Sequence, residues 1–354
     1  MVGTQKNSIN QMNNLLIEVA QKFVRELDRE SVVIKEINIG LINKTYKIED
    51  GANSYILQKI NTEVFHNPEL IQNNFQLVRA HLKTTDYQKE VLEFLILKNG
   101  SQLLFSEDYT WRMSKFIDAE NFRSLNSSQQ AKSAANSLAE FHLYLKDVEI
   151  KGFQNPIPEF CNFLFRISEF EKSIQNGDAH RIMNSTNLIQ GIKSNLPFVT
   201  KYIDMELTLP KRIIHGDPKI SNFLFHTNSV EVHAIIDMDT LMTGYVLYDF
   251  GDMVRSFTNS KAEDDSAQTN LFSSAIYTEL YNGYIEKGKE FLTKTEMEHL
   301  PHAAVCLPLI QSMRFLTDYL NMDVYYQVNH SEQNFKRAMN QFCLFEEINE
   351  YLSL

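Results

Sequence analysis

The sequence contains few residues that break or cross-link a chain: 12 glycines, 8 prolines and 3 cysteines among 354 residues. The cysteines, Cys161, Cys306 and Cys343, are odd in number and far apart, which argues against a disulfide framework or a cysteine-built metal site. No stretch approaches the roughly 18 apolar residues of a membrane-spanning helix, and the first residues lack the apolar core of a signal peptide. The sequence therefore predicts a cytoplasmic protein with reduced thiols and no membrane partner.

An excess of positive charge is also missing. The 34 Lys and Arg residues are outnumbered by 45 Asp and Glu residues, which gives a net charge of −11. Proteins that bind nucleic acids usually carry a basic surface, so we expect no nucleic-acid partner. The hydrophobic fraction of 43% and the scarcity of glycine and proline instead predict an ordinary folded protein rich in helix.

The period of the apolar residues changes along the chain and predicts an α+β protein. Helical spacing over 12–28 gives way to alternation typical of strands, and after residue 120 helical spacing dominates, with short β segments near the middle. Asn67 and Pro68 have the residue types that begin a helix, which should run to Leu82. We expect a small β-rich lobe over 1–117 and a larger, mostly helical lobe over 118–354. The predicted strands are 32–39, 44–49, 54–60, 102–105, 111–117, 212–214, 223–225 and 232–237.

The most informative stretch runs from His215 to Asn222 and reads His-Gly-Asp-Pro-Lys-Ile-Ser-Asn. Asp217 and Asn222 are five residues apart, with Lys219 between them, which is the spacing of the catalytic loop of protein kinases. Phosphoryl transfer needs a carboxylate to orient or deprotonate the acceptor hydroxyl, a cation for the γ-phosphate and an oxygen ligand for Mg²⁺. An ordinary polar turn is the alternative for these eight residues taken alone.

A second carboxylate strengthens the kinase interpretation. Asp237 ends an apolar strand 20 residues after Asp217, and a hairpin of that length brings it beside Asn222. A carboxylate and an amide oxygen suit a hard cation, so we predict that Asn222 and Asp237 hold Mg²⁺. Asp239 either belongs to the same site or caps the following turn.

The tripeptide Asp249-Phe250-Gly251 has the letters of the kinase metal motif but a different setting. It lies 32 residues after Asp217 and opens a helical pattern instead of ending a strand. We therefore assign the metal to Asp237 and expect Asp249 to hold the loop around His215 by accepting backbone N–H bonds.

These motifs, in this order, resemble the aminoglycoside phosphotransferase/choline kinase superfamily. The stretches 55–62, 236–240, 248–255 and 314–320 look like its N-acetylhexosamine 1-kinase branch, and the resemblance extends from Ile39 to Ile348. It implies a two-lobed protein-kinase-like fold, with ATP in the cleft, Asp217 as catalytic base and Mg²⁺ on Asn222 and Asp237. The chain departs from the branch in reading His-Gly-Asp-Pro-Lys where His-Asn-Asp-Thr-Lys is common, next to the expected acceptor pocket.

In the N-terminal lobe, we expect Gly40, Asn43 and Thr45 to cover the phosphates with their backbone N–H groups. Alternation places Gln58 and Lys59 on opposite faces of one strand, so only one of them points into the cleft. Lys59 is the chemically better phosphate partner, although the sequence does not fix the register. Phe116, Ile117 and Asp118 come at the end of the last strand of this lobe and are the expected hinge, where backbone groups meet the adenine.

For the acceptor, the resemblance places Arg314 at the sugar or phosphate, and Tyr325 just beyond can stack on a sugar ring. A structural ion pair with Asp318, four residues on, is the alternative for Arg314. The leading hypothesis is an ATP- and Mg²⁺-dependent kinase of a small-molecule hydroxyl, in a hexosamine or related sugar at its anomeric position. An aminoglycoside or amino-alcohol kinase, or a catalytically silent nucleotide-binding module, are the alternatives.

Overall fold

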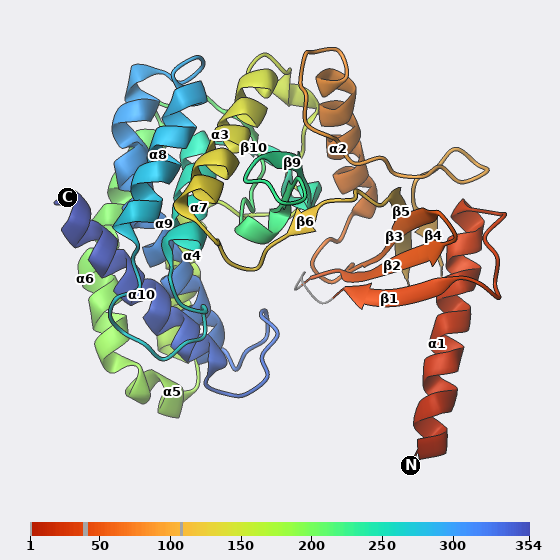
Figure 1. Cartoon of the computed structure of the whole chain (residues 1–354). Coiled ribbons are helices and arrows are strands. Elements are labelled where there is room, and N and C mark those ends of the chain that lie inside the picture. Colours follow the sequence, from red (N-terminus) through yellow and green to blue (C-terminus); the bar gives the residue numbers. More distant parts are fainter. Residues whose placement is uncertain (1, 38–41, 107–108) are drawn as a thin grey trace.

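The computed structural model describes residues 2–37, 42–106 and 109–354, and of residues 2–10 the backbone only. Its N-terminal part is an antiparallel sheet accompanied by two helices, and its C-terminal part is largely helical (Figure 1). The N-terminal elements are α1 (Val2–Phe23), β1 (Val33–Ile37), β2 (Lys44–Asp50), β3 (Asn53–Ile60), α2 (Pro68–Leu82), β4 (Leu104–Phe105) and β5 (Thr110–Lys115).

The C-terminal part contains eight α-helices within 109–354, together with three short 3-10 helices and five short strands. The strands are β6 (Glu120–Asn121), β7 (Arg212–Ile214), β8 (Phe223–Phe225), β9 (Val232–Ile235) and β10 (Met242–Gly244), and the 3-10 helices are η1 (Ile150–Gly152), η2 (Ile220–Asn222) and η3 (Met238–Thr240). The helices are α3 (Ser128–Leu145), α4 (Phe163–Asn176), α5 (Ala179–Asn184), α6 (Thr186–Glu206), α7 (Val246–Thr258), α8 (Ser274–Gly288), α9 (Lys294–Leu320) and α10 (Gln333–Leu352). The predicted fold class is confirmed, whereas the exact boundary at 117/118 stays a prediction.

The N-terminal sheet has the strand order β1-β2-β3-β5-β4. Its register places Thr45, Gln58 and Arg112 in one row across β2, β3 and β5. The opposite face packs against α1, where Leu57 and Trp111 are buried. Because side chains alternate along a strand, one face of β3 is committed to the α1 core and the other faces the rest of the molecule.

Helix α1 ends at Phe23, five residues earlier than the helical spacing predicts. The chain turns there and brings Leu27 into the same buried cluster as Leu16. Leu27 therefore has the spacing of a helical core residue, but it reaches the core from a turn. The start of α2 follows the prediction, since the side chain of Asn67 accepts the N–H of Leu70 and Pro68 is the first helical residue.

The C-terminal core is built around α9, which packs against α4, α6, α7 and α10, while α3 packs against α8. Of the helices in the described residues, none is long and apolar enough to cross a membrane. The loop that carries the predicted catalytic residues leaves β7 and enters β8, and α7 lies against η2 within it. The short strands β7 and β8 thus position the loop with the predicted catalytic residues, and α7 packs against that loop.

Candidate active site

The predicted catalytic loop brings its three polar side chains into contact. The Nζ of Lys219 lies 2.5 Å from Oδ2 of Asp217. The amide nitrogen of Asn222 donates to the backbone oxygen of Asp217 at 2.8 Å and faces its Oδ2 at 3.3 Å. Among the described residues none donates a hydrogen bond to the Oδ1 of Asn222, and Asn222 lines the cavity described below.

Asp237 lies next to Asn222, as the predicted hairpin requires. Phe223 of β8 pairs with Ile235 of β9, and the N–H of Ile236 donates to the backbone oxygen of Asn222 at 2.9 Å. The Asp237 backbone is left-handed, with φ 60°, and its carboxylate makes no hydrogen bond or ion pair with the described residues. Burial and the neighbouring Asp239 raise the pKa of Asp237 to about 6, against the opposing charge of Lys219.

The carboxylate of Asp249 is fully buried and accepts the backbone N–H groups of His215 at 2.6 Å and Gly216 at 2.8 Å. The ring of His142 lies 2.9 Å from its Oδ2 and 3.0 Å from the hydroxyl of Tyr284. The bonds to the loop that the sequence predicts for Asp249 are therefore present. They tie the loop to α3, α7 and α8 together.

His215 links the loop to the end of β9. Its Nδ1 lies 3.3 Å from the N–H of Asp217, and its Nε2 lies 3.0 Å from the backbone oxygen of Ile236. An N–H can only donate and a carbonyl can only accept, so this network assigns the ring proton to Nε2. Neutral His215 thereby holds the segment of Asp217 against the segment of Asp237.

Gly216 has φ +84°, and a Cβ at this position would lie 2.7 Å from the backbone oxygen of Thr240. Gly216→Asn should therefore lower Tm by several degrees, although Asn tolerates a left-handed backbone, because the crowding costs about 1–3 kcal/mol. Thermal unfolding measures the change. Gly100→Asn is the matched control, since Gly100 has φ +85° with nothing within 4 Å of its Cβ position. Equal losses in both variants would assign the effect to the backbone conformation alone.

The cleft between the N-terminal sheet and the predicted metal site has a cavity of about 200 Å³. Thr45, Phe116 and Ile117 line it, together with Asn222 and Asp237. The N–H of Phe116 donates to the backbone oxygen of Ser54 at 3.0 Å, so that group of the predicted hinge is already bonded. Gly40 lies outside the described residues.

The prediction that Lys59, and not Gln58, points into the cleft is wrong. Gln58 lines the cleft, while the Nζ of Lys59 lies 3.2 Å from the ring centre of Tyr109. The reason is the burial of Leu57 and Trp111 under α1, which commits the Lys59 side of the sheet to that core. The sheet's cleft face therefore carries an amide where a lysine was expected.

Sequence reasoning missed Arg112, which lies opposite Gln58 on β5. Its Nη1 and Nη2 bind the two oxygens of Asp239 at 2.6 and 2.8 Å, and its Nε donates to Gln58 at 2.9 Å. Arg112 and Asp239 are only 3% and 4% exposed. Asn43, predicted near the phosphates, donates to the same Asp239 at 2.8 Å and accepts the N–H of Asn61 at 2.9 Å.

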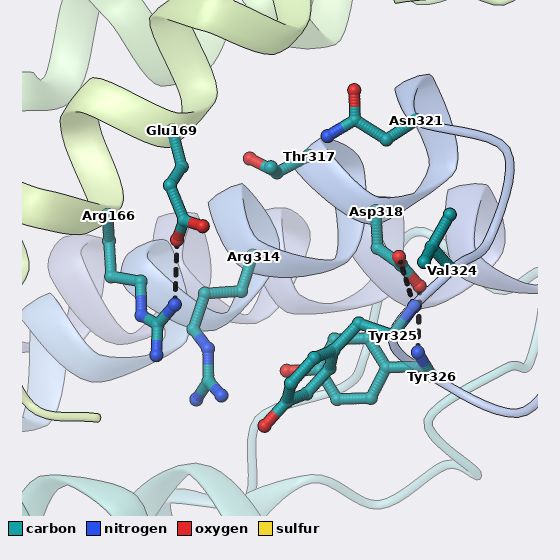
Figure 2. A pocket seen from close by; sticks show the side chains of 9 residues that line it. All are labelled: Arg166, Glu169, Arg314, Thr317, Asp318, Asn321, Val324, Tyr325 and Tyr326. Carbon is teal, nitrogen blue, oxygen red and sulfur yellow. Dashed lines mark hydrogen bonds and ion pairs between the residues drawn. The ribbon is translucent and has the colours of Figure 1, made fainter. Parts of the chain in front are cut away.

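A second cavity, of about 160 Å³, lies between α4 and the end of α9 (Figure 2). We call it the α4–α9 pocket; its lining residues are Arg166, Glu169, Arg314, Thr317, Asp318, Asn321, Val324, Tyr325 and Tyr326. The predicted alternative of an Arg314–Asp318 ion pair is wrong. Asp318 instead accepts the N–H groups of Tyr325 at 2.7 Å and Tyr326 at 2.9 Å, as Figure 2 shows.

Arg314 extends from α9 between Arg166 and the two tyrosine rings (Figure 2). Its Nη1 donates to Gln311 at 3.1 Å, and its guanidinium lies 5.9 Å from the ring centre of Tyr326. Within residues 109–354 and the other described ranges, no carboxylate lies within ion-pair distance of Arg314. The pocket thus holds one arginine whose charge is not matched, and the expected Tyr325 is on its wall.

Solved structures with similar folds include the microcompartment-associated aminopropanol kinase (17% identity, TM-score 0.63, covering 95% of this chain and 98% of that one). The choline kinase of Cryptosporidium parvum has 11% identity and a TM-score of 0.60, with 96% of both chains covered. Spectinomycin phosphotransferase in complex with ADP and spectinomycin has 14% identity and a TM-score of 0.57, covering 94% of this chain and 93% of that one. These similarities show the fold.

Sequence comparison finds acyl-CoA dehydrogenase family member 11 of Gallus gallus, 22% identical over 227 residues, which are 61% of this chain and 27% of that protein. The chain thus spans about a quarter of the length of this curated relative. The model of the phosphotransferase enzyme family (APH) matches residues 33–278, from β1 through the catalytic loop and α7 into α8. Since this match covers more than half of the chain, the protein belongs to the phosphotransferase enzyme family.

Proposed function

We propose that this protein transfers the γ-phosphate of ATP to the anomeric hydroxyl of a hexosamine or related sugar. The observation that supports the reaction most strongly is the meeting of Asp217, Lys219, Asn222 and Asp237 beside one cleft. The cysteines are free thiols, which suits the cytoplasm as the proposed compartment.

In the proposed reaction, Asp217 accepts the proton of the acceptor hydroxyl. The hydroxyl oxygen bonds to the γ-phosphorus, and the bond between the γ-phosphorus and the oxygen of the leaving ADP breaks. Lys219 supplies a positive charge beside this carboxylate. Burial alone would lower the pKa of the Lys219 amine, but Asp217, Asp237 and Asp252 outweigh it and raise that pKa. The amine therefore stays protonated at neutral pH, as a partner of the transferred phosphate must.

Asn222 and Asp237 are proposed to hold Mg²⁺, and the structure offers a specific reason. An unpaired carboxylate with a raised pKa lies beside an amide whose nitrogen is engaged and whose oxygen is not. Mg²⁺ commonly takes only one or two protein oxygens and completes its shell with phosphate and water. When bound, the ion would offset the charge of the phosphate oxygens. His215 and Asp249 hold both ligand segments in place.

The nucleotide is proposed to lie in the same cleft, with its base near Phe116 and Ile117 and its phosphates toward Thr45 and the metal site. Phe94, Leu224 and Ile236 give the cleft an apolar part that suits an adenine ring. This direction places the γ-phosphate at the end of the cleft where Asp217 contacts Asn222.

The acceptor is proposed to bind in the α4–α9 pocket, which α7 connects to the catalytic loop. Asp249 of α7 holds the loop, while the preceding Tyr248 packs against Phe160, 6.0 Å between ring centres. The guanidinium of Arg314 lies 5.2 Å from the same Phe160 ring. Contacts through Asp249, Tyr248 and Phe160 therefore link the catalytic loop to Arg314 in the pocket.

Among hexosamines and related sugars, the charges of the pocket favour a neutral acceptor, such as an N-acylated hexosamine or a sugar without an amine, over one that carries a cationic amine. Asp318 is occupied by backbone N–H groups, and Glu169 pairs with Arg166 at 2.7 Å. A choline-like or aminoglycoside cation would therefore meet Arg314 without an unoccupied carboxylate. The Oγ1 of Thr317 is buried and has no hydrogen-bond partner among the residues that the structure describes, which suits a ligand that offers hydroxyl groups.

Arg314→Ala should raise the KM of the acceptor by roughly 10-fold or more, the worth of a charge-assisted hydrogen bond, and leave the KM of ATP nearly unchanged. Steady-state kinetics with a panel of sugars, amino sugars, amino alcohols and aminoglycosides measures both values. Thr317→Val removes one hydroxyl at constant shape and should raise the acceptor KM by a smaller factor. Activity on amino alcohols or aminoglycosides, with none on any free sugar, would refute the sugar assignment.

A further inference from the structure

Kinases of this fold class place a cation from the N-terminal sheet on the nucleotide phosphates. In this chain the third strand cannot provide it, because Gln58 faces the cleft and Lys59 faces Tyr109. The cleft face of the sheet nevertheless carries a guanidinium, since Arg112 on β5 is paired directly with Gln58 and lines the same cavity. The sheet thus still presents a cation to the cleft, but from β5 and not from β3.

We propose that Arg112 is the residue that binds the nucleotide phosphates from the sheet, and that Asp239 positions it for that purpose. This inference rests on the proposed binding of ATP in the cleft. Both oxygens of Asp239 hold the guanidinium in a two-point pair, which fixes the plane and the direction of the group. Asn43 donates to the same carboxylate and so supports it from the other side.

The hydrogen-bond inventory of Arg112 leaves capacity for a ligand. A guanidinium has five N–H donors, and the described residues accept three of them, two at Asp239 and one at Gln58. One N–H on each terminal nitrogen thus remains for a second, oxygen-rich partner. The phosphate chain of a nucleotide is such a partner, and Asn222 and Asp237 lie in the same cavity to fix its other side.

The arrangement also differs from a pair formed within one lobe. Arg112 and Asn43 come from the N-terminal sheet and its loop, whereas Asp239 belongs to η3, two residues after the proposed metal ligand Asp237. The pair therefore sets the distance between the cation and the metal site directly. A purely structural pair in this place would need neither the two unused N–H groups nor a position on the cavity wall.

The test compares the binding of Mg²⁺·ATP and of adenosine by calorimetry in the full chain. Arg112→Gln combined with Asp239→Asn replaces the ion pair by a neutral pair, so that no buried carboxylate is left alone. We expect the Kd of Mg²⁺·ATP to rise roughly 10- to 100-fold, as for charged hydrogen bonds, while the Kd of adenosine, which has no phosphate, changes less than about twofold. Adding Gln58→Lys should recover a large part of the ATP affinity, because the new amine enters from the opposite strand.

Lys35→Gln is the control for loss of positive charge on the same sheet, since Lys35 is exposed and pairs with Glu49 at 2.6 Å. Wild-type affinity for Mg²⁺·ATP in the neutral-pair variant would overturn the inference, and so would an equal loss of ATP and adenosine binding. Failure of the unaltered protein to bind Mg²⁺·ATP would instead refute the proposed nucleotide site itself.

Discussion

Asp217→Asn is expected to lower kcat by roughly 10²–10⁴-fold, the usual contribution of a positioned general base. The variant keeps the size of the side chain and a hydrogen-bonding oxygen for Lys219 and Asn222, which both contact Asp217 in the structure. Folding and ATP affinity should therefore survive. Steady-state kinetics measures the loss, and calorimetry with ATP shows that the nucleotide still binds.

Asp249→Asn is the matched comparison, since the two aspartates are distinguished only by their surroundings. Asp249 receives the N–H groups of His215 and Gly216 on its two oxygens. An amide presents an NH₂ group to one of these donors, which leaves it buried without an acceptor at a cost of about 1–3 kcal/mol. Asp249→Asn should thus lower Tm together with activity, unlike Asp217→Asn. Loss of Mg²⁺ dependence at unchanged Tm would instead make Asp249 the metal ligand.

Asp237→Asn should abolish measurable turnover, with a loss on the order of 10³-fold or more, because metal-ion stabilisation of transferring phosphate contributes several kcal/mol. Asparagine accepts the left-handed backbone at this position, so the substitution tests the charge without straining the chain. Mg²⁺·ATP should also no longer raise Tm. Near-normal turnover would refute the metal assignment.

Asp237→Asn is also expected to change the stability of the metal-free protein, where it should be favourable and not harmful. The folded-state pKa of Asp237 is raised from 3.8 to about 6, so the folded state binds this proton more tightly than the unfolded state does. The carboxylate therefore lowers stability as pH rises from about 4 to about 6, and the penalty is complete at pH 7. Asp237→Asn should raise Tm at pH 7 in the absence of metal and leave it unchanged below about pH 4. Thermal unfolding across this range measures the difference.

The sequence predicts well the contacts that depend on local spacing. Asp217, Lys219 and Asn222 lie on one loop, and the β8–β9 hairpin is short enough that its length alone brings Asp237 to them. The helical pattern after Leu247 also predicts that Asp249 meets the loop, and Asp249 in the first turn of α7 accepts the N–H groups of His215 and Gly216. In these cases the residues are joined by short segments, and few conformations of such a segment are compatible with the sequence pattern.

Contacts between distant segments escape such reasoning. Five consecutive residues of β5, from Thr110 to Ser114, are buried, so no alternation indicates which face Arg112 takes. A lone arginine between Trp111 and Met113 was the available signal. Similarly, the four-residue spacing of Arg314 and Asp318 indicates a pair, but the chain after α9 folds back and its N–H groups occupy the carboxylate. The spacing of residues within α9 does not predict the path of the loop that follows it.

The direct pairing of Gln58 with Arg112 across β3 and β5 has a consequence for the evolution of such sheets. Two exchanges, one on each strand, can transfer a cation between neighbouring strands while its charge stays in the same place. An alignment would show no lysine in one column and an unrelated arginine in another, although a cation from the sheet still lines the cleft. The cation should therefore be sought at both positions of the cross-strand pair. A related chain that lacks the lysine should be examined at both positions before it is classed as inactive.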